Sequence, residues 1–487
     1  MNAAHKTLPF APGATMTCHS PLTIPVPPLA EADQPRALDP RDPMQTARQM
    51  LADRFSLDGQ QTLYRHREGF FWFSTSSYRP VDDDSIRTEI WKYLERAVKL
   101  EAGVYNRFKP TKMRVEDVYA ALSSLCNLDS MVVPPAWLDE GIAHAPADEF
   151  IPVANGLLHL PSQKLLPASP NYFSIGGSDV LFDPHAPQPR IWLKFLHDTF
   201  GDECQSIDLL QEWMGYCLSA NTSQHKIMLV VGPPRSGKST VASLLTSLLG
   251  KSNVVAMSMA SLSETFGLES FIGKKLAISG DARIDGRVDQ SSIVERLLGI
   301  SGEDTQTINR KFRHAWSGRL PTRLMMLSNE LPRLADNSGA LAKRFLVLQT
   351  IRSVYGEEDH TLEARLRAEM PGILNWAMDG YRRLRDRGRF VQPESGLQAI
   401  REVEELASPI KAFVDEKCCL DGEVPISEIY SAYVPWCKDN GHEAASKLTF
   451  GRNLKAAVPG LKQSQLRNGD DRQRFYVGIR LKQGRNS

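Results

Sequence analysis

The sequence predicts an α/β protein with a central domain of alternating strands and helices, an α+β domain before it and a small DNA-binding type of domain after it. Three observations predict this. A glycine-rich loop lies between an apolar strand and a helix, and further apolar strands follow, each ending in a polar residue. The final stretch reads as three helices and a hairpin. The 487 residues, 42% hydrophobic and 24% charged, suit a globular chain of roughly two to four domains.

The glycine-rich loop follows the apolar strand 227–231 and has the spacing G-x-x-x-x-G-K-S that is typical of a phosphate-binding P-loop. Its glycines permit the backbone angles that direct N–H groups at phosphate oxygens. We expect Lys238 to reach the β- and γ-phosphates of ATP and Ser239 to bind Mg²⁺. The strand and helix on either side argue against a chance match. The predicted nucleotide-binding residues are Gly232, Pro233, Pro234, Arg235, Ser236, Gly237, Lys238, Ser239 and Thr240.

Before the loop, residues 1–45 are rich in proline and poor in large apolar side chains, which predicts a disordered tail. An α+β domain is expected over residues 46–205. Its predicted elements are helices at 46–55, 85–100, 115–128, 191–200 and 208–220, short strands within 63–78, and a hairpin at 150–160 turning at Asn155-Gly156. The aromatic residues near Arg65, His66 and Arg67 could stack on bases, but a small hydrophobic core is the favoured interpretation.

The central domain is expected over residues 206–392. An apolar strand at 275–281 ends in Asp281, where an acid would hold Mg²⁺ directly or through water. Ala282 follows, where many ATPases carry a second acid that polarises the attacking water. Three acids could replace it, and the sequence does not rank them: Glu264, Glu269 and Asp285.

Three further features follow Asp281 in chain order. Residues 305–314 form a predicted strand pair with a basic tip, which includes Arg310 and Lys311. The apolar strand 323–329 ends in Asn329, whose amide could orient a water beside the γ-phosphate. Arg344 begins another apolar strand and could act as an arginine finger. A strand-end arginine paired with an acid is the alternative for Arg344, and a solvated surface hairpin is the alternative for Lys311.

After two helices within 363–384 and a linker at 392–396, residues 393–487 are expected to form a winged helix. Its predicted helices are 409–418, 426–437 and 446–457, followed by a hairpin turning at Asn468-Gly469. The net charge of the chain is only +1, so nucleic-acid binding needs a local basic patch. The third helix and the hairpin supply one, with Arg452, Lys455, Arg472 and Arg474 as the expected DNA contacts; a solvated basic face is the alternative.

The order of these stretches resembles the superfamily 3 helicases, in the phage, plasmid and poxvirus-type primase–helicase branch. GPPRSGKST, LAISGDA, SGEDTQTINRKFRHAWSGRLPTRLMMLSNELPRL and SGALAKRF carry the resemblance, with FIPVANGLLHL, WLKFL and LLQEWMGYCL upstream. It covers residues 60–480. It implies a hexameric AAA+ ring that moves 3′ to 5′ on single-stranded DNA, with Lys238 and Ser239 at phosphate and Mg²⁺. It also implies that Asp281 is the Walker B acid, Asn329 sensor 1, Arg344 the trans finger and Lys311 a pore residue.

The resemblance predicts an ATP-dependent replicative helicase of a phage, plasmid or integrated element. Two alternatives stay open: an initiator that melts an origin without processive unwinding, and a small-molecule P-loop kinase. No zinc-ligand cluster or acid pair for polymerisation is evident, so no primase activity is expected and a separate primase or host replication protein is a possible partner. The seven cysteines, without a C-x-x-C pair, and the absence of a long apolar run predict a cytoplasmic protein with no membrane contact.

Overall fold

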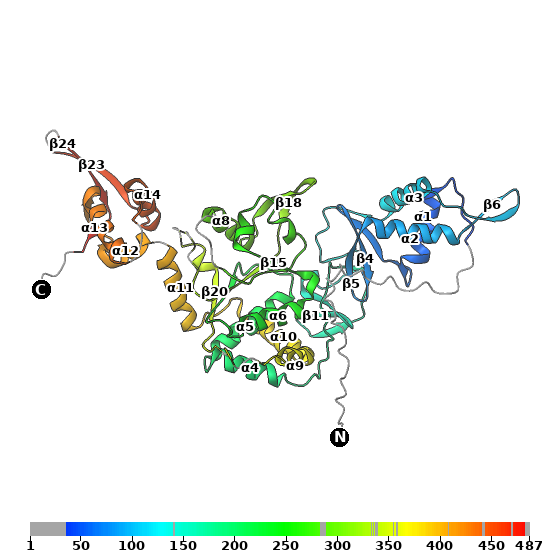
Figure 1. Ribbon diagram of the computed structural model, residues 1–487, viewed down its shortest axis with the longest axis horizontal. Coiled ribbons are helices and arrows are strands. Elements are labelled where there is room, and N and C mark those ends of the chain that lie inside the picture. The colour runs from blue at the N-terminus through cyan, green and yellow to red at the C-terminus, as the bar shows by residue number, and fades with distance from the viewer. Residues whose placement is uncertain are drawn as a thin grey trace, which may run out of the picture.

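The computed structural model describes residues 36–482, apart from residues 140–141, 283–288, 333, 335, 337–338, 354, 357–358, 408, 441–443 and 469–470, and apart from the side chains of 405–407, 466–468 and 471–473. Three units follow one another along the chain (Figure 1). The N-terminal unit (blue) and the C-terminal unit (orange and red) lie on opposite sides of a larger central unit. No described helix combines the length and apolar character needed to cross a bilayer.

The N-terminal unit packs three helices against one face of a four-stranded sheet of order β5-β4-β3-β8. The helices are α1 (Pro43–Arg54), α2 (Asp83–Arg96) and α3 (Lys112–Leu125), and the strands are β3 (Leu63–His66), β4 (Gly69–Ser74), β5 (Ser77–Val81) and β8 (Asn127–Leu128). Aromatic side chains such as Phe70 are buried, so the core interpretation of this cluster is confirmed. Helix α2 stops before the predicted end at Leu100, which lies instead in a two-stranded hairpin of β6 (Val98–Glu101) and β7 (Val104–Arg107).

The predicted tail ends earlier than residue 45. Leu38 is buried in the core of the N-terminal unit, and its backbone N–H donates to the carbonyl of Val98. Residues 36–45 are therefore part of the fold, because one leucine and an edge contact suffice to anchor a proline-rich segment. Residues 1–35 lie outside the described residues.

A second, smaller group of strands joins the N-terminal unit to the centre. It consists of the two-stranded pair β9 (Ala136–Trp137) with β13 (Tyr172–Phe173) and the sheet β10 (Phe150–Val153), β11 (Gly156–His159) and β12 (Lys164–Leu166). The pair β1 (Ser56–Leu57) with β2 (Gln60–Gln61) lies within the N-terminal unit, between α1 and β3. The predicted hairpin at 150–160 is present, although Gly156 pairs with Val153 and the turn is Ala154-Asn155. The Asn155 side chain donates to the Phe182 carbonyl and accepts from the Phe182 N–H, which holds the segment around Phe182 against the hairpin.

The central unit is built on a five-stranded parallel sheet of order β15-β16-β19-β14-β20. Its strands are β14 (Ile227–Val231), β15 (Val254–Met257), β16 (Leu276–Ser279), β19 (Arg323–Ser328) and β20 (Phe345–Gln349). Alternate residues of β14 enter two cores: Met228 and Val230 face one, and Ile227, Leu229 and Val231 face the other. This explains the unbroken apolar run, since a strand with two buried faces needs apolar residues at every position.

Helices cover both faces of this sheet. One core is shared with α4 (Arg190–Phe200), α5 (Cys204–Leu218), α6 (Lys238–Leu249), α9 (Leu362–Ala368) and α10 (Met370–Arg387). The other is shared with α7 (Met259–Ser263), α8 (Gln290–Ser301) and α11 (Glu394–Ala407). The predicted break at Pro371-Gly372 lies instead at Glu369, because Pro371 occupies the first turn of α10, where its missing N–H costs little.

The predicted linker at 392–396 runs into a helix, α11, which begins at Glu394 and extends to Ala407. Gln392 bonds both the N–H and the carbonyl of Val347 in β20, and Ala399 and Val403 of α11 are buried beside that strand. This helix therefore belongs to the central unit, although the predicted boundary at 392/393 assigns it to the C-terminal domain.

Helices α5 and α10 pack closely enough for their backbones to touch. A Cβ at Gly215 would lie 2.2 Å from the carbonyl oxygen of Ala377. Across the same interface, the Glu212 side chain is only 2% exposed and accepts from Arg383 Nε at 2.7 Å and from Arg387. A buried carboxylate thus joins α5, which precedes the glycine-rich loop, to α10, which follows the sheet.

We expect Glu212→Ala to lower the Tm of the central unit by about 5 °C, because it removes the buried acceptor that Arg383 and Arg387 share, at a cost of about 2 kcal/mol; Arg383 keeps Asp208 at 3.2 Å. Asp379→Ala is the matched control, since its 2.6 Å pair with Arg382 on α10 is half-exposed on both sides and should contribute less than about 1 kcal/mol. Thermal unfolding followed by circular dichroism measures both. Equal Tm values for the two variants would contradict a structural role for Glu212.

The C-terminal unit has its own core. It contains the helices α12 (Pro409–Lys417), α13 (Ile426–Asp439) and α14 (Lys447–Ala457), the sheet of β22 (Glu423–Pro425), β24 (Asp471–Val477) and β23 (Lys462–Asn468), and the pair β21 (Cys418–Cys419) with β25 (Arg480–Leu481). Asn468 faces Asp471 in the β23–β24 register, so a hairpin closes where predicted. Gly469 in its turn lies outside the described residues.

Candidate functional site

The glycine-rich loop connects β14 to α6 and wraps around the N-terminus of that helix. Gly237, with a φ of 87°, precedes Lys238, and no side chain caps the helix. A Cβ on Gly237 would meet the ring of Phe195 at 2.8 Å, and one on Gly232 would meet Thr350 Oγ1 at 1.9 Å. Only glycine fits at both positions. The loop therefore leaves the first-turn N–H groups of a 12-residue helix available to an anion, which fits the phosphates of ATP.

Lys238 occupies the inside of this loop. Its ammonium donates to the carbonyls of Gly232 and Pro233, both at 2.7 Å, and to Ser236 Oγ at 3.2 Å. The side chain is 8% exposed, and burial lowers the pKa of its amine. A compact cation is thus held among loop carbonyls at the point where a phosphate would bring negative charge.

The segment after β20 lies against the loop and was not predicted to contribute. Ser236 Oγ lies 2.6 Å from Thr350 Oγ1, and the Thr350 backbone N–H donates to Val231. Ser353 Oγ donates to the carbonyl of Pro234. These hydroxyl groups are brought near by strand pairing between residues far apart in the chain, and no local motif signals them.

Asp281 and Asn329 lie at the same sheet edge as the loop. Val231 is in register with Ser328, and the Gly232 N–H donates to the Ser328 carbonyl, so Asn329 directly adjoins the loop. On the other side of β19, the Ala282 N–H donates to the Leu327 carbonyl, which places Asp281 at the same level. Both Asp281 and Asn329 are exposed. The three features that the sequence predicted separately are therefore brought together.

The same edge suits Mg²⁺ bound partly by nucleotide oxygens. Ser239 is exposed in the first turn of α6, and Asp281 is exposed two strands away. Among the described residues, no three His, Cys, Asp or Glu side chains cluster as a metal cage. Few protein ligands are typical of Mg²⁺, which keeps waters and substrate phosphates in its shell. Ser239, Asp281 and phosphate oxygens fit that chemistry.

The three candidates for the acid that polarises the attacking water have different surroundings. Glu269, in the short helix Glu269–Phe271, accepts from the Lys311 backbone and lies 3.9 Å from Arg310. The Glu269 carboxylate therefore contacts the basic hairpin. Glu264 is exposed at the end of α7, which follows β15. Asp285 lies outside the described residues.

Arg344 lies at the other end of the sheet from the loop of its own chain. Phe345 is in parallel register with Ile227, the first residue of β14, whereas the loop follows Val231, the last. The separation along the strand is roughly 20 Å at the usual rise per residue. Arg344 Nη1 donates to Ser301 Oγ at 3.2 Å. The alternative prediction, a strand-end arginine paired with an acid, receives no support from this hydrogen bond.

The predicted basic hairpin is present as β17 (Thr305–Arg310) and β18 (Arg313–Arg319), and it projects beyond the sheet (Figure 1). Phe312 at its tip is 96% exposed, with Lys311 Nζ 5.4 Å from its ring centroid. Arg310 differs from the expectation of a free DNA contact. Its side chain is 13% exposed and donates to Glu68 at 2.8 Å, because the β3–β4 turn of the N-terminal unit packs against the hairpin.

The predicted DNA contacts of the C-terminal unit fall on α14 and β24. Arg452 and Lys455 are exposed on α14, and Arg474 is exposed on β24. Lys455 donates to Gln463 of β23, so α14 and the hairpin lie side by side. Arg472 is on β24, but its side chain lies outside the described residues. Two other basic residues are used within the fold: Arg480 pairs with Asp421, and Lys482 donates to the last carbonyls of α12.

Two family models match parts of the chain. Residues 230–344, from the loop strand to Arg344, match the model described as a family of unknown function (DUF5906). Residues 408–475 match the model described as Poxvirus D5 protein-like.

Solved structures share the fold of most of the chain. An A form apo structure of the NrS-1 C terminal region is 13% identical with a TM-score of 0.50, and covers 85% of this chain and 96% of that one. A second apo structure of that region is 12% identical with a TM-score of 0.52, and covers 90% and 99%. At these identities the likeness concerns the fold alone. In its C-terminal unit this chain is similar to poxvirus D5-like proteins, and over most of its length it has the fold of the NrS-1 C terminal region.

Proposed function

We propose that this protein is an ATP-driven replicative DNA helicase of a phage, plasmid or integrated element. One observation carries the proposal: Lys238, Asp281 and Asn329 lie at the carboxyl ends of the parallel strands, while Arg344 lies at their amino ends, on the opposite side of the sheet along the strand direction. A site of this kind is incomplete in one subunit. A neighbour that turns its Arg344 toward the loop would complete it, and repetition of that interface closes a ring, most simply a hexamer.

The strand order supports an AAA+ core of the superfamily 3 type. The loop strand β14 lies between β19 and β20, and the Asp281 strand lies beyond β19. In that arrangement Lys238 and the α6 N-terminus bind the phosphates, and Asp281 with Ser239 binds Mg²⁺. Asn329 orients the attacking water, and Arg344 of a neighbour stabilises the transferring phosphoryl group. ATP supplies the free energy for movement.

The tip of the β17–β18 hairpin is proposed to bind single-stranded DNA. Lys311 and Phe312 form its tip, and the backbone of Lys311 is held by Glu269 at 3.2 Å. In a ring, a hairpin that projects from the sheet would face the channel. A lysine binds phosphate and an exposed aromatic ring can stack on a base, so the tip has both interactions that single-strand binders use.

We expect Lys311→Ala to keep ATPase activity but lose unwinding of a forked duplex by at least about tenfold, because the substitution removes a phosphate-binding charge from every subunit of the ring. Lys343→Ala is the control, as an exposed lysine of the same unit away from the hairpin. Strand displacement and ATP hydrolysis are measured on the same preparations. If Lys311→Ala unwinds at the wild-type rate, the hairpin is an ordinary solvated surface feature.

The C-terminal unit is proposed to be a winged helix that binds duplex origin DNA. It has three helices and a β23–β24 hairpin beside the third helix, with Arg452, Lys455 and Arg474 exposed. Because α11 packs on β20, a deletion that begins at residue 409 removes this unit and leaves the central core covered.

Deletion of residues 409–487 should weaken binding to duplex DNA and make the dependence of log affinity on log salt shallower, because each phosphate that a lysine or arginine neutralises adds about 0.9 to the magnitude of that slope. Basal ATPase should persist, because the deletion leaves the glycine-rich loop, Asp281 and Asn329 in place. Fluorescence anisotropy with a labelled duplex across a salt series measures the change. An unchanged affinity and slope would show that the basic face does not bind DNA.

A further inference from the structure

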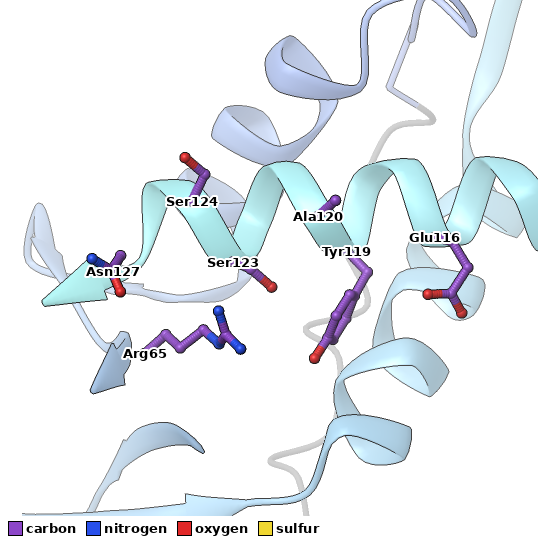
Figure 2. Close-up of a pocket in the computed structure, with 7 residues that line it drawn as sticks. All are labelled: Arg65, Glu116, Tyr119, Ala120, Ser123, Ser124 and Asn127. Atoms are coloured by element: carbon purple, nitrogen blue, oxygen red, sulfur yellow. The ribbon is translucent and has the colours of Figure 1, made fainter. Parts of the chain in front are cut away.

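A groove lies in the N-terminal unit, away from the nucleotide loop, between β3 and α3 (Figure 2). Its volume is about 690 Å³, and it is open to solvent. The Arg65 guanidinium lies at one end and the Glu116 carboxylate at the other, and both sit under the same face of α3. The helicase proposal assigns no role to this groove.

Arg65 is fixed in the groove by strand pairing. Its backbone N–H donates to the Cys126 carbonyl at 2.7 Å, and it is in parallel register with Asn127 of β8. Its Nε atom is buried and has no hydrogen-bond partner among the described residues; its guanidinium lies 5.8 Å from the Phe70 ring centroid. A buried guanidinium donor without a partner is costly, so an acceptor from outside the chain would stabilise it.

Ser123 provides a second donor beside Arg65. The residue is 8% exposed, and its hydroxyl has no hydrogen-bond partner among the described residues. In a helix such a hydroxyl commonly bonds the carbonyl one turn earlier, as Ser301 of α8 does with Leu297. The Ser123 hydroxyl instead points toward the Arg65 guanidinium (Figure 2). Two buried, unpartnered donors thus converge on one space.

The acid at the other end is already neutralised. Glu116 accepts from Arg87 Nε at 2.9 Å, and Arg87 lies 4.2 Å from the Tyr119 ring centroid. Burial raises the pKa of the Tyr119 hydroxyl, and a hydrogen bond to Asp83 raises it further. An anion at the Arg65 end therefore meets a guanidinium that has no ion pair among the described residues and the Ser123 hydroxyl, while Glu116 lies further along α3 and Asp83 lies on α2.

We propose that this groove binds the phosphate group of a nucleotide, either free or within a single strand. Guanidinium and hydroxyl donors match the oxygens of phosphate, and one open groove of this volume accommodates a nucleotide. The choice of phosphate over another anion rests on the proposed function. Arg65 is on β3, which leads into the turn whose Glu68 contacts the β17–β18 hairpin, and the two residues are roughly 10 Å apart along the chain. A DNA single strand that leaves the hairpin tip can therefore reach the groove.

The test compares groove variants of the full-length chain that all carry Lys238→Ala. This background weakens phosphate binding at the glycine-rich loop, so that differences in affinity between the variants report on the groove. Inorganic phosphate, dTMP and a dT oligonucleotide are titrated by isothermal titration calorimetry. Arg65→Ala should weaken binding about tenfold or more, and the near-isosteric Ser123→Ala severalfold. Arg79→Ala is the matched control, since Arg79 lies in the same sheet but is paired with Asp179 at 3.1 Å. Circular dichroism melting checks folding.

If the substitutions weaken binding of all three probes, or of the oligonucleotide alone, the groove binds single-stranded DNA. If they weaken binding of phosphate and dTMP alone, the groove binds a free nucleotide. Equal affinities of the Arg65→Ala, Ser123→Ala and parent proteins for every probe would overturn the site, as would absence of binding. Because Arg65→Ala on an otherwise wild-type chain should retain basal ATPase, loss of the groove's binding is distinguishable from failure of the helicase proposal.

Discussion

Lys238→Ala should reduce ATP hydrolysis by at least about a hundredfold while the protein remains folded. The ammonium lies within the loop at 2.7 Å from two carbonyl oxygens, where a bound phosphate would supply the negative charge that a buried cation needs. Its removal takes away the point charge that would meet the β- and γ-phosphates. Asp281→Asn should still bind ATP but hydrolyse it slowly, because the amide binds Mg²⁺ more weakly than the carboxylate.

Phosphate release in a steady-state assay measures both variants, and nucleotide binding is measured separately by fluorescence of a labelled ATP analogue. Lys251→Ala is the matched control, since Lys251 is exposed just beyond the far end of α6. Its activity should equal that of the wild type. Normal turnover by Lys238→Ala would remove the basis for ATP hydrolysis at this loop.

Arg344→Ala should reduce ATP hydrolysis by about a thousandfold or more, the usual effect of losing an arginine finger. The side chain cannot act on its own loop, because Phe345 pairs with Ile227 at the far end of β14. Its bond to Ser301 is to a neutral hydroxyl, so its charge remains available to a neighbouring subunit. Lys343→Ala, at the adjacent exposed residue, should retain activity.

A mixing experiment tests whether the arginine acts between subunits. Arg344→Ala and Lys238→Ala proteins are each expected to be inactive. In mixed rings, some interfaces contain an intact Lys238 facing an intact Arg344, so partial ATPase activity should return. No recovery in rings shown to be mixed, or near-normal activity of Arg344→Ala alone, would contradict the trans role.

The central sheet could be predicted closely because its signals are local. The run Ile227–Val231 is apolar at every position, as a strand with two buried faces requires, and the glycines at 232 and 237 mark the loop that follows. Parallel pairing then brings Asp281 and Asn329 to the loop without further information, since the carboxyl ends of parallel strands meet at one edge. This is why the order of motifs along the chain sufficed to propose the site.

The features that could not be predicted depend on packing between distant segments. Arg310 looks like a free basic residue in sequence, but Glu68 binds it from another unit. Helix α11 follows a proline and polar residues that resemble a linker, and only packing against β20 makes it part of the core. The donors in the groove also escaped prediction, because neither Arg65 nor Ser123 forms a recognisable motif without the strand pairing that brings them together.

The proposed function depends on coupling ATP hydrolysis to strand separation, and a strand-displacement assay on a forked DNA tests that coupling directly. The account predicts that the wild-type protein displaces the strand with ATP and Mg²⁺, that single-stranded DNA stimulates its hydrolysis, and that Lys238→Ala does neither. Hydrolysis without displacement would instead indicate an initiator that only melts an origin. Hydrolysis unaffected by DNA, with no displacement, would contradict a nucleic-acid motor altogether.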